Sequence, residues 1–137
     1  MGTMHYPSLP GAEVIDVEFL TLDGGIRTLR LLVDSGFSGR SSFVLPEHVS
    51  SLFRAEVPAV QTVGALEGVR NRAWVTCRIS VLSFQATLIA IYADTASLSL
   101  PPDVDGLAGL AFLRHFSRWG AERMETGWQF FLATDEP

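Results

Sequence analysis

Hydrophobic and polar residues alternate along much of this chain, which is the pattern of strands with one buried face. Apolar and acidic residues alternate over 15–19, at the period of a half-buried strand. The residues Asp23, Gly24 and Gly25 then predict a tight hairpin turn. The chain is expected to return as a strand over 26–33, in which Leu29, Leu31 and Val33 share one face. The N-terminal part of the chain is therefore predicted to begin with a β-hairpin.

The middle of the chain continues this strand pattern. We expect a short strand over 41–45 that ends at Pro46, where proline followed by an acid favours the start of a brief helix that ends near Phe53. Residues 60–81 resemble a long hairpin with its turn around 67–71, where Gly and Asn tolerate positive backbone angles. A nearly unbroken apolar run over 86–93 predicts a central strand.

The C-terminal third contains the best helix candidate. Leu110, Leu113 and Phe116 recur at helical spacing, and Gly120 favours a stop, so we expect a helix over 110–119. A last strand over 128–132 should follow a turn at 126–127. Many strands, one or two short helices and no helix–strand alternation indicate a mostly β fold.

Composition narrows the class of protein. A chain of 137 residues with 47% hydrophobic and 18% charged residues is expected to fold as one globular domain. Its net charge of -5 argues against nucleic acid as the main partner, because phosphate binding needs a basic face. A single cysteine, Cys77, fits a reducing compartment. No signal peptide or membrane-spanning run is recognisable, so we expect a cytoplasmic protein without a membrane partner.

Several familiar chemistries lack their required residues. The segment 36–39 does not have the spacing of a serine nucleophile elbow, and Cys77 has no basic helper nearby in the sequence. Asp103 and Asp105 lie in a predicted surface turn without further ligands at a calcium-loop spacing. No histidine pair has metal-binding spacing; the three histidines are His5, His48 and His115. No metal or cofactor is therefore expected.

After these exclusions, catalysis by a carboxylate is the remaining possibility, and Asp34 at the end of an apolar run is the candidate residue. The sequence over 31–39 is LLVDSGFSG, an apolar run that ends in an acid, a hydroxyl and a glycine. Removing a carboxylate from water at the end of a buried strand costs several kcal/mol of folding free energy unless hydrogen bonds or a shared proton stabilise it. The alternative is an Asp that caps an ordinary turn. One Asp cannot serve as both acid and base, but a second copy of the chain can supply another across a two-fold axis.

Two motifs resemble the single-domain, retropepsin-like aspartic proteases, particularly the small bacterial and archaeal members. These carry an apolar strand, Asp-Thr/Ser-Gly, an aromatic or small residue, Ser-Gly, a short strand and Leu-Pro. Here LLVDSGFSG is followed by FVLP at 43–46. A second family signature, two apolar residues and Gly leading into a helix, is matched by LAGLAFL at 107–113. Each motif is weak alone, and their order and spacing strengthen the resemblance.

The resemblance implies a closed β-barrel or sandwich with one short C-terminal helix, holding half of an active site. The domain would span 13–133, between an N-terminal tail over 1–12 and a C-terminal tail over 134–137. It further implies a homodimeric aspartic endopeptidase that acts on a peptide or protein substrate. Asp34 would activate a water, Ser35 would hydrogen-bond across the dimer, and Gly36 would allow close backbone approach.

The same resemblance assigns supporting roles. Leu107, Ala108 and Gly109 would hold the Asp34 loop rigid, and Gly64 and Gly68 would belong to a hairpin flap over the substrate. Ser35 stands where Thr is commoner, and the hairpin is not a close match to viral flaps. Two alternatives stay open: a non-catalytic dimerisation or peptide-binding module of the same fold, and an unrelated small β-barrel in which Asp34 only shapes a turn.

Overall fold

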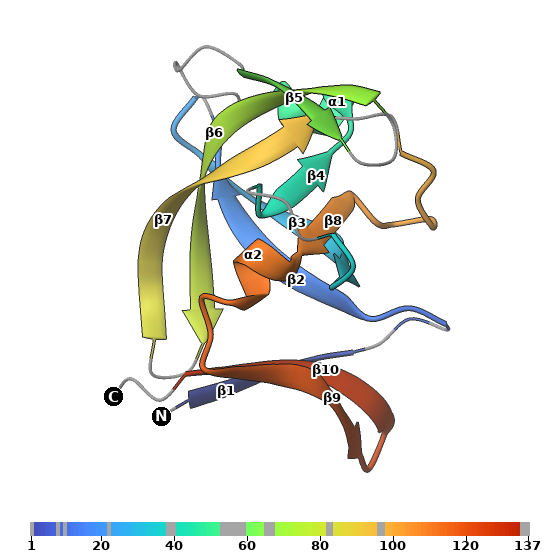
Figure 1. Cartoon of the computed structure of the whole chain (residues 1–137). Helices are drawn as coiled ribbons and strands as arrows, with labels where there is room; N and C mark the ends of the chain where they lie inside the picture. Colours follow the sequence, from blue (N-terminus) through green and yellow to red (C-terminus); the bar gives the residue numbers. More distant parts are fainter. Residues whose placement is uncertain are drawn as a thin grey trace.

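The structure is a computed structural model that describes residues 2–7, 9, 11–21, 23–37, 41–52, 60–64, 68–81, 84–95 and 98–134. The described residues form ten strands and two short helices. The prediction of a mostly β fold is therefore confirmed. The strands belong to two separate sheets, one of seven strands and one of three (Figure 1).

The larger sheet has the strand order β2-β3-β8-β4-β7-β6-β5. Its strands are β2 (Val14–Leu20), β3 (Ile26–Asp34), β4 (Phe43–Leu45), β5 (Val60–Gly64), β6 (Gly68–Val81), β7 (Phe84–Thr95) and β8 (Gly106–Gly109). The pairs β3–β8 and β4–β7 are parallel, and the remaining neighbours are antiparallel. A strand from the C-terminal third, β8, therefore lies between β3 and β4.

The closed barrel implied by the resemblance is not found among the described residues. β2 does pair with β6, but only through Glu18 opposite Arg78 and Phe19 opposite Cys77. The same end of β2 is already paired with β3. Strand twist brings distant strands of one sheet together, and here that approach yields a short contact rather than a continuous ladder.

The smaller sheet joins the two ends of the chain. It has the order β1-β10-β9, with β1 (Gly2–Pro7), β9 (Arg118–Met124) and β10 (Gly127–Thr134) all antiparallel to their neighbours. Gly2 lies opposite Thr134, so β1 begins where β10 ends (Figure 1). The expected tail over 1–12 is therefore wrong for β1. Tyr6 is buried in the core and Met4 packs against it, which explains why this segment is held.

The described part of the chain contains two four-residue helices, α1 (Glu47–Ser50) and α2 (Leu110–Leu113). The brief helix after Pro46 was expected, whereas the helix predicted over 110–119 ends at Leu113. The chain then turns, and the Ser117 backbone N–H and hydroxyl both donate to the Ala133 carbonyl, at 3.0 and 3.1 Å. The predicted second half of the helix is thus a turn over 114–117, after which residues 118 and 119 begin β9 and pair with β10.

The hairpin of β5 and β6 has its turn earlier than predicted. Gly64 lies opposite Gly68, and the ladder continues as Val63 opposite Val69 and Gln61 opposite Asn71. Residues 69–71, predicted to form the turn, are therefore paired strand residues. The connecting residues 65–67 lie outside the described part of the chain.

Buried side chains of both sheets and of α2 form one hydrophobic core. Its largest members include Phe19, Phe43 and Phe112, each with no exposed surface. The ring centroids lie 5.0 Å apart for Phe19 and Phe43, and 4.9 Å apart for Phe43 and Phe112. Tilted rings at such separations add to the stabilisation that burial provides. This packing fixes α2, and with it the end of β8, against the body of the domain.

Candidate active site

Asp34 is the last residue of β3, and the chain turns immediately after it. The Gly36 N–H donates to Asp34 Oδ1 at 3.1 Å, and the Phe37 N–H donates to the Asp34 carbonyl at 3.1 Å. The Asp34 side chain is half-buried, while Ser35 and Gly36 are exposed. These bonds form a local turn in which the aspartate side chain mimics a backbone acceptor. The Asp34 carboxylate is thereby held in place at the end of β3.

β8 backs this turn through a parallel ladder with β3. Leu107 pairs with Leu32, Ala108 with Val33, and Gly109 with Asp34. Leu107 is half-buried, Ala108 and Gly109 are buried, and the Gly109 N–H donates to the Ser42 carbonyl at 2.8 Å. All three residues assigned to loop support therefore lie directly beside the strand that ends in Asp34.

Gly109 is required by the close approach of the Asp34 loop. A Cβ at this position would lie 2.4 Å from Phe37 Cδ2 and 2.8 Å from the Phe37 carbonyl oxygen. The next residue, Leu110, donates its N–H to that same carbonyl at 2.8 Å. The loop after Asp34 therefore rests on Gly109 and on the first residue of α2.

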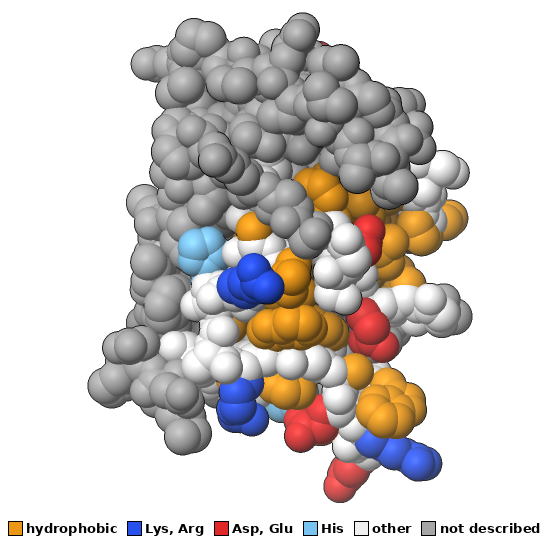
Figure 2. Space-filling model, in the orientation of Figure 1, with side chains coloured by type: hydrophobic (Ala, Val, Ile, Leu, Met, Phe, Trp, Pro, Cys, Tyr) orange, Lys and Arg blue, Asp and Glu red, His pale blue; other side chains and the backbone are white. Residues whose placement is uncertain are grey.

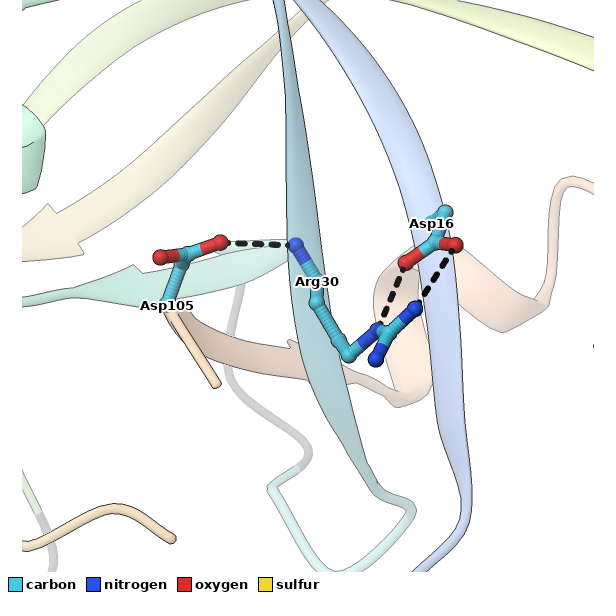
Figure 3. A network of polar contacts seen from close by, with 3 residues as sticks. All are labelled: Asp16, Arg30 and Asp105. Carbon is cyan, nitrogen blue, oxygen red and sulfur yellow. Dashed lines mark hydrogen bonds and ion pairs between the residues drawn. The ribbon is translucent and has the colours of Figure 1, made fainter. Parts of the chain in front are cut away.

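A polar network sets the register of β3 against β8, and sequence reasoning missed it (Figure 3). The Arg30 N–H donates to Asp105 Oδ2 at 2.9 Å, and the Asp105 N–H donates to the Arg30 carbonyl at 2.7 Å. The Arg30 guanidinium donates to both carboxylate oxygens of Asp16, at 3.1 and 3.5 Å. Hydrogen bonding and charge from Asp16 raise the pKa of Arg30. The network lies just before the ladder that ends at Asp34 and Gly109.

The two glycines assigned to a flap lie at the end of the β5–β6 hairpin. Gly64 and Gly68 face each other across the ladder, on different strands from Asp34. The residues that join them are not described, so their part in substrate binding stays a prediction.

The other candidate groups are not gathered into a site in the described part of the chain. Asp103 lies in an exposed turn with φ of 66°, and Asp105 binds the Arg30 backbone. His5 contacts Glu122 on the smaller sheet at 2.6 Å, while His48 and His115 are exposed. No group of three or more His, Cys, Asp or Glu that could hold a metal ion is found among the described residues.

Comparison with known proteins gives no assignment, since neither a family model nor a curated protein matches this chain. Among the described residues, no helix is long and apolar enough to cross a membrane. A function must therefore be inferred from the Asp34 turn and its backing strand. That arrangement offers one carboxylate in a fixed position beside an exposed hydroxyl.

Proposed function

We propose that this chain is one half of a homodimeric aspartic endopeptidase of the retropepsin-like type. Two copies would bring their Asp34 carboxylates together on a two-fold axis. The observation that carries the proposal is the placement of Asp34. It ends a strand in an Asp-Ser-Gly turn, its Oδ1 accepts the Gly36 N–H at 3.1 Å, and Gly109 of an inserted strand lies beside it.

The proposed reaction uses a water held between the two carboxyl groups, of which one is ionised and one is protonated. The ionised group takes a proton from the water as the water oxygen attacks the scissile carbonyl carbon. The protonated group of the other copy donates its proton to the carbonyl oxygen. Collapse of the tetrahedral intermediate breaks the C–N bond: the first carboxyl group gives its proton to the leaving nitrogen, and a hydroxyl group of the intermediate gives its proton to the other carboxylate, so that an amine and a carboxylic acid are released. Two carboxyl groups thus exchange the roles of acid and base.

The neighbouring residues would support this reaction in the roles that the resemblance implies. Exposed Ser35 would hydrogen-bond across the dimer axis, and Gly36 would let the second copy approach the carboxylates closely. A Cβ on Gly36 would lie 3.2 Å from Asp34 Oδ1, already a tight contact. The β5–β6 hairpin, with Gly64 and Gly68, would close over an extended peptide and exclude water.

A second Asp-containing turn in the same chain, at Asp23, serves as a comparison, because there the aspartate only shapes the turn. Asp23 accepts the Gly25 N–H at 3.2 Å through Oδ1, nearly the same local geometry as Asp34 and Gly36. The Asp23 turn is exposed, and no described atom lies within 4 Å of the position that a Gly24 side chain would take. Asp34 differs because an inserted strand packs behind it. This contrast supports a role for Asp34 beyond shaping a turn.

The test compares the two aspartates. Asp34→Asn keeps the side-chain size and the oxygen that accepts the Gly36 N–H, and we expect it to lower kcat/KM on a diverse peptide library by about 1,000-fold or more between pH 3 and 7. Asp23→Asn should leave cleavage unchanged. Intact protein that binds peptides without cleaving them would support the non-catalytic module instead. Equal activity of Asp34→Asn and the parent would remove Asp34 from the mechanism.

A further inference from the structure

Among the described residues, β9 is an edge strand of the smaller sheet. It is the last strand in the order β1-β10-β9, and β10 is its paired neighbour. All of its residues are exposed except Gly120, which is half-buried. The β9–β10 hairpin extends away from the larger sheet (Figure 1). An edge strand of this kind presents unpaired backbone N–H and C=O groups that can pair with another chain.

The side chains around this edge are partly apolar. Trp119 and Met124 on β9 are 36% and 37% exposed, and Trp128 on β10 is 58% exposed. Figure 2 shows hydrophobic side chains beside charged side chains of both signs where the β9–β10 hairpin lies. The sequence of β9 is RWGAERM; it has no proline, and its three charged residues protect the edge unless a partner strand brings opposite charges to them.

Two of the three charged residues of β9 lie symmetrically about Gly120. Arg118 lies two residues before it and Glu122 two residues after it, so both side chains point to the same face of the sheet. If two β9 strands pair antiparallel around a two-fold axis at Gly120, each Arg118 lies opposite the partner's Glu122. Opposite charges at directly opposed positions stabilise a strand pair, and like charges destabilise it.

Other two-fold registers lack this complementarity. An axis at Arg118, Glu122 or Arg123 places two identical charges opposite each other. An axis at Trp119 or Ala121 brings no opposite charges into register, and an axis at Met124 pairs Arg123 only with the partner's Glu125, which lies in the turn beyond β9. Residues that lie directly opposite each other in an antiparallel pair point to the same face of the sheet. A register slipped by one residue would oppose residues that point to different faces. The two-fold axis must therefore pass between two copies of the same residue. Charge therefore selects the register at Gly120.

Both charged side chains are already held on one face. Glu122 Oε1 lies 2.6 Å from His5 Nε2, and the Arg118 guanidinium carbon lies 5.8 Å from the Phe131 ring centroid. The His5 and Phe131 rings are 6.0 Å apart, so these four side chains form one group that spans the three strands. Side chains that are held before association lose less conformational entropy on binding.

We propose that a second copy of this chain docks along β9, antiparallel and with the two-fold axis at Gly120. The two three-stranded sheets would then form one six-stranded sheet. Two Arg118–Glu122 pairs would lie on one face, and Trp119 would face the partner's Ala121 on the other. This contact is separate from the Asp34 pairing of the proposed function, which also joins two copies of the chain. The two contacts are distinguished by peptide cleavage, which the β9 variants should leave unchanged even where they weaken assembly.

Charge reversal tests the contact. Arg118→Glu would set two carboxylates against each other at both places where Arg118 now lies opposite the partner's Glu122. The dissociation constant, measured by analytical ultracentrifugation at low salt, should therefore rise about tenfold or more. The double variant R118E/E122R restores opposite charges and should recover assembly. Arg123→Glu is the matched control, because position 123 faces an uncharged Ser117 in this register, and it should not change assembly.

Three results would overturn the proposal: a parent protein that is monomeric at about 100 μM, well above the Kd range of specific interfaces; an unchanged dissociation constant in R118E; or dissociation caused equally by R123E. Thermal unfolding of each variant verifies that the domain is folded. An R118E/E122R protein that is folded but fails to reassemble would also contradict the register.

Discussion

Asp34 and Gly109 lie opposite each other in the parallel β3–β8 ladder, and each is the last residue of its strand. The loop after Asp34 turns back so that Phe37 occupies the space where a Gly109 side chain would lie. The acid and the residue behind it therefore share one backbone ladder. A displacement of the β8 backbone at Gly109 therefore acts directly on the backbone of Asp34, with no side chain between them.

Gly109→Ala should destabilise the domain and disturb the Asp34 loop. The added methyl group would lie 2.8 Å from the Phe37 carbonyl oxygen, which is backbone and cannot move aside easily. We expect a loss of about 1–3 kcal/mol in the free energy of unfolding, as for other overpacked sites. Gly25→Ala is the control, because its Cβ would meet an exposed Thr21 hydroxyl at 3.2 Å, and it should cost less than about 0.5 kcal/mol. Equal costs in urea denaturation would contradict this role of Gly109.

Asp105→Ala should loosen the start of the same ladder. The substitution leaves the partly buried Arg30 N–H without its side-chain acceptor, which should cost about 1–2 kcal/mol in unfolding free energy. Asp105→Asn keeps an acceptor oxygen and should cost less. Asp103→Asn, in the adjacent exposed turn with φ of 66°, should be nearly neutral, since Asn tolerates positive φ. Chemical denaturation in which Asp105→Ala matches Asp103→Asn would exclude the register role.

Local pattern was sufficient to predict the strand and turn that carry Asp34. The apolar run before it and the Ser-Gly after it predicted a strand end, and β3 ends at Asp34. The pattern could not reveal the register with Gly109 or the contact with Phe37, because these depend on how residues more than 70 positions apart meet. Asp105 was considered only as a metal ligand, since nothing local indicates an acceptor for the Arg30 N–H.

The smaller sheet was the least predictable part of the fold. β9 is exposed on both faces, so its sequence lacks the period-2 alternation that indicates a half-buried strand. Leu113 and Phe116 are indeed buried, but the helical spacing that includes them ends with a turn into β9. In β1, Met4 and Tyr6 do alternate with polar residues. That signal is short, and the partner strand β10 lies at the other end of the chain.

Stability should fall at high pH because of Tyr6. Burial, with a smaller contribution from the charge of Asp16, raises the pKa of Tyr6 to about 12 from a reference value of 10.0. Below pH 10 the phenol is protonated in both states, so its contribution to stability is complete. Between pH 10 and 12 the unfolded chain ionises first, and stability falls by up to about 1.4 kcal/mol per pH unit.

Tyr6→Phe isolates this effect. The variant lacks the ionisable hydroxyl, so its unfolding free energy relative to the parent should improve by about 1–2 kcal/mol between pH 9 and 11.5. All ten basic residues are arginine, so no lysine titrates in this range. Guanidinium denaturation at several pH values gives the difference directly. A parent–variant difference that stays constant with pH would contradict the raised pKa.

The most direct test of the central claim is a mixing experiment with the parent and Asp34→Asn. If an active unit needs Asp34 from two copies, only the square of the parent fraction is active after subunits exchange. An equal mixture at fixed total concentration should then show about one quarter of the parent's peptidase activity, whereas mixing with Asp23→Asn should cause no loss. Activity that falls in simple proportion to the parent fraction, to about one half, would contradict a site shared between two chains, and no cleavage by the parent would contradict the proposed function.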